Sequence, residues 1–65
     1  MLPLNDREQE IIELVCNGKS NEDVATIMGL GKPTVAGKLR VIYAKLEAKN
    51  RAEACAHFVA LQQRK

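Results

Sequence analysis

The sequence is poor in the residues that build β-sheets and enclosed active sites. It has no tryptophan, and Tyr43 and Phe58 are its only aromatic residues among 65. Small β-barrels and sandwiches depend on aromatic and β-branched residues, whereas an apolar set made mostly of leucine, isoleucine, valine, alanine and methionine suits helices. A chain this short buries only about 60% of the surface that its unfolded form exposes. That excludes a multilayer enzyme built around a substrate cavity.

Long apolar segments and clustered metal ligands are also missing. No apolar run approaches the length of a bilayer span, and the first residues lack the basic and hydrophobic regions of an export signal. We therefore expect a cytoplasmic protein with no membrane partner. Cys16 and Cys55 have no cluster of histidine or cysteine around them, and in a reducing compartment we expect them to be unpaired, small apolar residues.

The charged residues are distributed unevenly along the chain. The formal net charge is only +2. Residues 1–30 nevertheless carry two basic and six acidic residues, a charge of −4, whereas the remaining residues carry eight basic and two acidic ones, a charge of +6. Individual lysines can be explained as part of an ordinary solvated surface, but this explains the unequal charge of the two parts of the chain less well. The C-terminal half is therefore suited to face a polyanion.

Capping signals, glycines and one proline predict four helices. A small polar residue followed three positions later by an acid marks three helix starts: Asn5 with Glu8, Ser20 with Asp23, and Asn50 with Glu53. Pro33, which is tolerated within a first turn, marks the remaining start. Gly18 and Gly29 mark stops, because glycine readily takes left-handed torsions. The expected helices cover residues 6–17, 21–28, 32–47 and 51–63.

The second and third predicted helices are joined by a very short turn. Only Gly29-Leu30-Gly31 separates them, which forces the helices to cross sharply. A short helix, a tight glycine-bearing turn and a longer helix form the helix-turn-helix arrangement. Within the third segment, Val35, Leu39, Ile42 and Leu46 recur at the spacing of a single buried face. We therefore expect an all-α, four-helix domain that contains a helix-turn-helix.

A set of residues across nearly the whole chain matches a known family in order and spacing. These are Leu4, Arg7-Glu8, Gly18, Ser20-Asn21, Val24-Ala25, Leu30, Thr34-Val35, Ile42, Lys45-Leu46, Asn50-Arg51 and residues 52–54. The chain thereby resembles the DNA-binding domain of the LuxR/GerE family of bacterial transcription regulators. The resemblance implies that the third helix enters the major groove of double-stranded DNA and that the fourth helix forms a homodimer on an inverted repeat. Residues 1–65 then form one domain without a sensor, either free-standing or excised.

The third predicted helix departs from the family pattern. Members usually continue Thr-Val with Lys, a variable residue and His, whereas Thr34-Val35 is followed here by Ala36, Gly37 and Lys38. In the family, the positions equivalent to Ala36, Gly37 and Arg40 are among those that reach base edges. Two of these three positions lack a useful side chain here. An alternative therefore stays open, a protein-binding antagonist that pairs with a related regulator and has lost base-specific reading.

The candidate DNA-binding residues lie opposite the apolar stripe of the third helix or at helix starts. Arg40 is the expected base reader, because arginine bidentate to guanine is the commonest specific contact, and Val41 offers at most contact with a thymine methyl group. Gly37 lies on the same outward side. Phosphate contacts are expected from Lys19, Ser20, Lys32, Thr34, Lys38 and Lys45. Two alternatives remain, that Thr34 is only a first-turn residue and that Lys45 is only a solvated one.

The last predicted helix carries two apolar stripes on nearly opposite sides. One consists of Ala52, Cys55, Ala56 and Val59, and the other of Ala54, Phe58 and Leu61. A bundle of this size buries one stripe, and we expect Ala54, Phe58 and Leu61 to form the homodimer interface. The alternative is that both stripes lie inside one core. We expect His57 on the surface or on the partner face.

No catalytic chemistry is predicted. The segment from Gly29 to Thr34 is unlike a true phosphate-binding loop, because Pro33 and Thr26 occupy the places that Ser or Thr and the first glycine require. His57 and Cys55 point in different directions on a helix, which argues against a shared metal. The acidic first helix offers no pocket that would perturb a carboxylate. We expect a protein that is not an enzyme and has no cofactor or metal.

Overall fold

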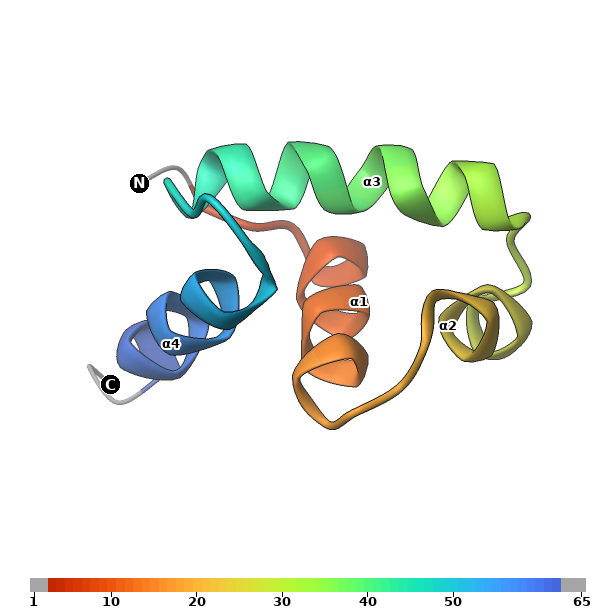
Figure 1. The fold of residues 1–65 in the computed structure, drawn as a ribbon, viewed down its shortest axis with the longest axis horizontal. Helices are drawn as coiled ribbons and strands as arrows, with labels where there is room; N and C mark the ends of the chain where they lie inside the picture. Colours follow the sequence, from red (N-terminus) through yellow and green to blue (C-terminus); the bar gives the residue numbers. More distant parts are fainter. Residues whose placement is uncertain (1–2, 63–65) are drawn as a thin grey trace.

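The computed structural model describes residues 3–62, which form four helices and no strand (Figure 1). α1 spans Asp6–Cys16, α2 spans Asn21–Met28, α3 spans Lys32–Lys45 and α4 spans Arg51–Gln62. The predicted all-α fold is therefore confirmed. The predicted last residue of the fourth helix, Gln63, lies outside the described residues. Within the described range, no helix is long and apolar enough to cross a membrane.

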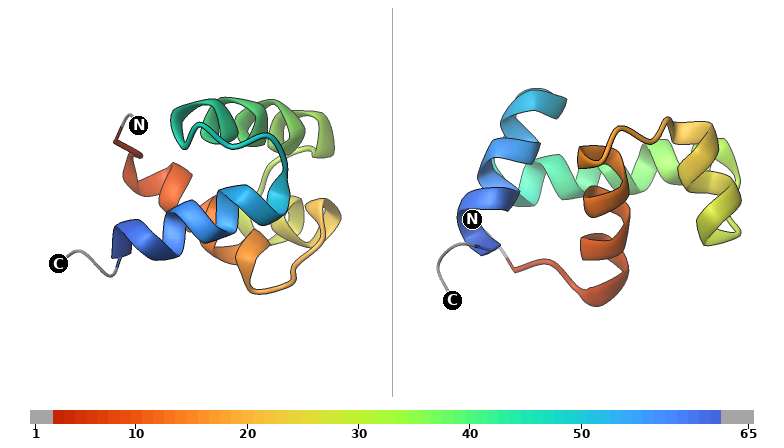
Figure 2. Two further views of the ribbon diagram at one scale, coloured as in Figure 1. Left: turned by 60° about the vertical axis from the view of Figure 1, so that its left-hand side comes forward. Right: turned by 90° about the horizontal axis from the view of Figure 1, so that it is seen from below.

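The helices are arranged around α1. α3 runs along one side of the molecule, α1 crosses beneath it, and α2 and α4 lie at opposite ends (Figures 1 and 2). One hydrophobic core joins all four helices, and its buried apolar residues are Ile11, Ile12, Val15, Val24, Ala25, Val35, Leu39, Ile42, Leu46, Ala54 and Phe58. The four residues of the predicted α3 stripe are at most 6% exposed. The orientation of α3 predicted from its stripe is confirmed.

The first two helices begin at the predicted capping boxes. The Asn5 side chain accepts from the Glu8 N–H at 2.8 Å, and the Glu8 carboxylate accepts from the Asn5 N–H at 3.0 Å. Ser20 and Asp23 form the same reciprocal pair at 3.1 and 3.5 Å. These bonds satisfy backbone N–H groups that have no partner inside the helix.

The start of α4 forms only half of its predicted box. The Asn50 side chain accepts from the Glu53 N–H at 2.9 Å, as expected. The Glu53 carboxylate, however, accepts from the Lys49 N–H at 2.8 Å instead of from the Asn50 N–H. The helix still starts at Arg51, and the Asn50 side chain caps one of its free N–H groups.

The turn between α2 and α3 has the predicted glycine geometry. Gly29 adopts a left-handed conformation with φ 69°, and the Leu30 N–H donates to the Ala25 carbonyl at 2.8 Å. This closes α2, and Gly31 then serves as the N-cap of α3. The helix-turn-helix arrangement results from the glycine that ends α2 and the glycine that begins α3.

α3 ends two residues earlier than predicted. The prediction extended to residue 47, whereas α3 ends at Lys45. Glu47 takes a left-handed φ of 54°, and the Ala48 N–H donates to the Tyr43 carbonyl at 2.9 Å. This is the closing pattern that glycine usually provides. Because a glutamate occupies the position, the sequence contains no stop signal there.

The apolar stripes of α4 are reversed relative to the prediction. Ala54 and Phe58 are only 0% and 5% exposed, and Leu61 packs against the same core. The expectation that Ala54, Phe58 and Leu61 form an outward dimer interface is therefore wrong. Phe58 is the large residue of the helix, and burying it removes far more apolar surface from water than burying alanines would. The stripe left exposed, hereafter the outer stripe of α4, consists of Ala52, Ala56 and Val59.

The two cysteines are joined, contrary to the prediction that they are unpaired. Cys16 is the last residue of α1, and Cys55 lies in α4. Packing of α4 against α1 brings their Cα atoms to 5.5 Å, and a disulfide connects them across a sequence separation of 39. The cysteines were interpreted from their sequence surroundings alone, and these do not reveal that two helices so far apart in sequence meet at this point.

The burial of Phe58 predicts a large difference between two neighbouring residues of α4. Phe58→Ala should lower the free energy of unfolding by about 3–5 kcal/mol, because it leaves a cavity in the core. Val59→Ala should change it by no more than about 0.5 kcal/mol, because Val59 lies on the surface. Urea unfolding followed by circular dichroism measures both. Similar losses for the two variants would contradict the observed orientation of α4.

Candidate nucleic-acid interface

One face of α3 is uncovered. Pro33, Gly37, Arg40 and Ala44 are all exposed, and no described helix lies on the outer side of α3 (Figure 1). With 14 residues, α3 is about 21 Å long. A major groove about 12 Å wide admits a helix of this kind. The side of α3 that the sequence assigned to DNA is therefore free to make contacts.

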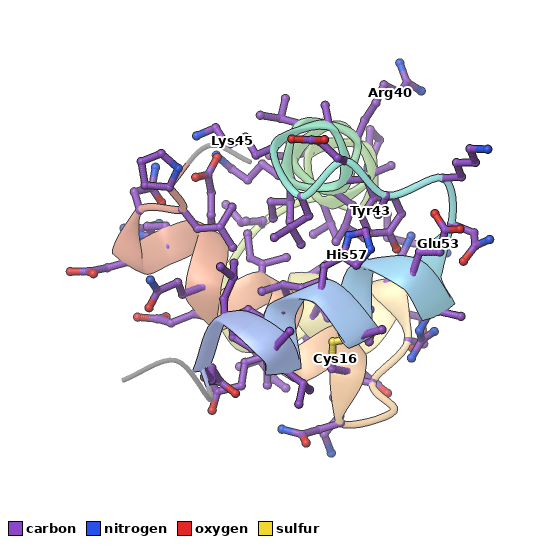
Figure 3. The ribbon with its side chains drawn as sticks, turned by 90° about the vertical axis from the view of Figure 1, so that its left-hand side faces the viewer. Cys16, Arg40, Tyr43, Lys45, Glu53 and His57 are labelled. Atoms are coloured by element: carbon purple, nitrogen blue, oxygen red, sulfur yellow. A yellow bond between two sulfur atoms is a disulfide. The ribbon has the colours of Figure 1, made fainter. Side chains whose placement is uncertain are left out.

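Arg40 projects from this face. In Figure 3 its side chain points away from the body of the protein, whereas Tyr43 lies on the inner side of α3. Beside Arg40 is a shallow depression of about 290 Å³, lined by Asn21, Ala36, Leu39, Arg40 and Tyr43. The start of α2 thus lies next to the arginine. Asn21 is not among the residues predicted from the sequence, because no sequence spacing shows that the start of α2 borders this part of α3.

A second depression lies on the α1 side of α3. It has a volume of about 330 Å³ and is lined by Asn5, Arg7, Glu8, Ile11, Thr34, Gly37, Lys38 and Val41. Four predicted residues, Thr34, Gly37, Lys38 and Val41, are brought together here. The depression also adds a cation, Arg7, that the site prediction omitted. Arg7 belongs to the acidic half of the sequence, and only the fold places it beside α3.

The start of α3 offers unpaired backbone donors. Its N-cap, Gly31, makes no side-chain hydrogen bond, so the N–H groups of Lys32 and Thr34 have no cap to satisfy them. The Lys32 ammonium lies 3.4 Å from a Glu22 carboxylate oxygen, and both side chains are exposed. Exposed pairs of this kind contribute little energy. The pair with Glu22 therefore does little to hold the Lys32 side chain in place.

The start of α2 is less suited to an anion than the start of α3, because its N–H groups are already capped. Lys19 is exposed there, but the Ser20 hydroxyl caps α2 by accepting from the Asp23 N–H at 3.1 Å. The Asp23 carboxylate sits at the same helix end and opposes a phosphate. The structure thus gives Ser20 a capping role and leaves Lys19 as the cation available at this end.

Lys45 has a structural partner that neither sequence interpretation anticipated. Its ammonium donates to both carboxylate oxygens of Glu8, at 2.8 and 3.0 Å, and the two side chains are only 26% and 12% exposed. This hydrogen bond and the one from the Asn5 N–H lower the pKa of Glu8, although burial opposes the shift. Lys45 is thus neither a free phosphate contact nor a solvated residue. It joins the end of α3 to the start of α1.

His57 also differs from the prediction. It is half-buried, and its Nδ1 lies 2.6 Å from the Leu46 carbonyl oxygen. Because a carbonyl oxygen only accepts, Nδ1 must carry the proton. His57 therefore attaches α4 to the end of α3, beneath Tyr43 in Figure 3, and does not belong to an outward partner face.

Comparison with known proteins agrees with this geometry. The family described as bacterial regulatory proteins, luxR family, matches residues 2–58. The transcriptional regulatory protein DesR of Bacillus subtilis (strain 168) is 44% identical over 52 residues, which are 80% of this chain and 26% of DesR. The HTH-type transcriptional regulator MalT of Vibrio campbellii is 36% identical over 52 residues, 80% of this chain and 6% of MalT. The chain thus spans about a quarter of DesR and a smaller share of MalT.

A solved structure has the same fold. A chain in the crystal structure of the Vibrio cholera VqmA–ligand–DNA complex superposes with a TM-score of 0.82 and 27% sequence identity. The superposition covers 91% of this chain and 26% of that chain. The similarity therefore extends over all but a small part of the four-helix domain.

The ion pair of Glu8 and Lys45 predicts a pH dependence of stability. Because the folded pKa of Glu8 lies below its ordinary value of 4.5, its contribution is complete above that value and is lost as the pH falls through the folded pKa. Glu8→Gln keeps a hydrogen-bonding side chain for the capping box but removes the charge. It should cost about 1 kcal/mol at neutral pH, and the cost should vanish in acid.

Urea unfolding at a series of pH values measures this effect. Lys45→Met serves as the matched variant, and the double variant completes a thermodynamic cycle. A coupling energy indistinguishable from zero at neutral pH would show that the ion pair does not stabilise the fold.

Proposed function

Because the chain belongs to the luxR family of bacterial regulatory proteins, we propose that it binds double-stranded DNA by placing α3 in the major groove. The observation that carries the proposal is the uncovered face of α3, from which Arg40 projects (Figure 3). Its opposite face is buried in the core, so only this face is available. The bound duplex is the proposed partner, and transcription control is the proposed role.

The proposed contacts follow from the two depressions beside α3. Arg40 reads a base edge, and Val41, whose side chain is half exposed, contacts a thymine methyl group. Phosphates on the α1 side of the groove meet Lys38 and Arg7, which line or border the same depression. Phosphates near the helix starts meet Lys19, Lys32 and the N–H and hydroxyl of Thr34.

Gly37 shapes this contact surface by its lack of a side chain. An added Cβ at Gly37 would meet no heavy atom within 4 Å, so internal packing does not require a glycine there. Ala36, the residue before it, also provides no hydrogen-bonding group. Base reading then rests mainly on Arg40, and phosphate contacts supply most of the affinity. Binding of this kind weakens steeply as salt concentration rises.

Arg40 and Lys38 should affect DNA binding in different ways. Arg40→Ala should weaken binding to the preferred sequence by about 1–3 kcal/mol and relax specificity, because it removes a base contact. Lys38→Ala should weaken binding to all sequences similarly and reduce the salt slope by about one. The preferred sequence is first selected from random duplexes, and fluorescence anisotropy at several salt concentrations then compares it with an unrelated duplex.

Lys49→Ala is the matched control, because Lys49 lies beyond the end of α3 and outside the proposed contacts. It should leave both specificity and salt slope unchanged. If Arg40→Ala loses the same binding free energy on both duplexes, Arg40 does not read a base. Absence of salt-dependent binding to any duplex would instead favour the protein-binding antagonist.

A homodimer through the outer stripe of α4 completes the proposal. Ala52, Ala56 and Val59 form an exposed apolar surface, with Val59 44% exposed. Small side chains allow two copies of a helix to approach closely, and a two-fold axis places the same stripe against itself. Two α3 helices would then meet half-sites about one DNA turn, or 34 Å, apart on an inverted repeat.

Substitutions at two surface valines distinguish the contribution of dimerisation from that of direct DNA contact. Val59→Asp should weaken binding to a duplex with two half-sites by at least about tenfold, because it sets like charges against each other across the dimer. Binding to a single half-site should be unchanged. Val41→Asp, at an equally exposed valine on α3, should weaken both duplexes. Sedimentation with and without DNA measures the dimer. Unchanged two-site binding by Val59→Asp would exclude this interface.

A further inference from the structure

We infer that Cys16 and Cys55 form a reversible redox site, which low-molecular-weight disulfides such as oxidised glutathione close and thiols open. The two Cα atoms lie 5.5 Å apart, within the range that a disulfide spans without backbone movement. Both residues are partly exposed, so the site lies at the surface and is not enclosed in the core. Neither cysteine belongs to the proposed DNA contacts, and Cys55 lies at the edge of the outer stripe of α4, where it is less exposed than Ala52, Ala56 and Val59.

The site lies on the far side of the domain from the DNA-facing helix. In Figure 3, Arg40 projects beyond α3 at the top of the molecule, whereas Cys16 lies below α3, beside α4. DNA bound along the outer face of α3 would therefore not cover this pair. The redox state of the pair can change in the free protein, and the reagent does not compete with DNA for the same surface.

Closure of the pair is a two-step thiol–disulfide exchange. In the reduced protein, one cysteine thiolate attacks a sulfur of oxidised glutathione and displaces one glutathione thiolate, leaving a mixed disulfide. The second cysteine thiolate then attacks the protein sulfur of that mixed disulfide and displaces the second glutathione. The two protein thiols lose two electrons and two protons in all, and one glutathione disulfide becomes two glutathione thiols. Excess glutathione reverses both steps.

The bond matters because it closes a loop around the functional part of the fold. The 39-residue separation of the two cysteines encloses α2 and α3, so the disulfide restricts the unfolded chain over the entire helix-turn-helix. At the same place, the Arg51 guanidinium donates to the Val15 carbonyl at 2.6 Å. The start of α4 is thereby fixed to the end of α1 by one covalent and one polar link, and reduction removes the covalent one.

Loss of the covalent link should change stability strongly in so small a domain. A chain of this size has a thin margin of stability. For a loop of this length, reduction should lower the midpoint of thermal unfolding by about 15–30 °C. Between the two midpoints, the oxidised chain is folded and the reduced chain is not. The redox state would then determine whether α3 is presented to DNA, a consequence that rests on the proposed function.

The first experiment uses the full chain and glutathione alone. The protein is equilibrated at increasing ratios of oxidised to reduced glutathione, free thiols are alkylated and counted by mass spectrometry, and thermal unfolding is followed by circular dichroism. We expect both thiols to disappear together and the unfolding midpoint to rise with them. C16A/C55A is the control and should have one low midpoint at every ratio. Cys16→Ala alone should leave Cys55 as a mixed disulfide with glutathione.

The second experiment measures DNA binding of the oxidised and reduced protein at two temperatures. One temperature is below both midpoints, where the two forms should bind alike, and the other lies between them, where only the oxidised form should bind. Thiols that persist at every glutathione ratio, coincident midpoints, or a redox response that survives in C16A/C55A would each overturn the redox site. Separate midpoints with no DNA binding at either temperature would support the site and refute the proposed function.

Discussion

The buried stripe of α3 is the constraint on which the rest of the structure depends. Val35, Leu39, Ile42 and Leu46 fill the centre of a core to which every helix contributes. A helix that buries one face must expose the opposite one. Arg40 follows a buried residue directly in sequence yet projects into solvent, because successive residues of a helix are about 100° apart. Packing of valine, leucine and isoleucine thus determines which side of α3 is exposed to solvent.

The features that the sequence predicts well are those set by neighbouring residues. The capping pairs Asn5–Glu8 and Ser20–Asp23 form because their members are one helical turn apart. The left-handed Gly29 ends α2 for an equally local reason, since only glycine takes that conformation without cost. The apolar spacing of α3 is also contained within one helix. Four helices and a helix-turn-helix could therefore be derived without knowing how the helices pack.

The features that the sequence did not predict depend on contacts between distant segments. Glu8 and Lys45 are 37 residues apart, and Cys16 and Cys55 are 39 apart. In α4 both stripes are apolar, so periodicity alone could not decide which one meets α1. Side-chain size decides it, because Phe58 fills a gap between helices that alanine would leave open. Glu47 is the local exception, since a glutamate in a left-handed conformation carries no sequence signal.

Pairing determines which of the cations can act on DNA. Lys38 and Lys45 are two turns apart on α3, and both are predicted from the sequence as phosphate contacts, although Lys45 is also open to a role as a merely solvated residue. The fold places a carboxylate against Lys45 and leaves Lys38 beside Arg7, a cation from the acidic half of the chain. The charge of +6 in the C-terminal half therefore counts Lys45, which Glu8 neutralises, and leaves out Arg7, which lies in the N-terminal half. Because α1 supplies both the acid that neutralises Lys45 and the arginine that joins Lys38, its position on α3 sets the electrostatics of the contact surface as well as the packing of the core.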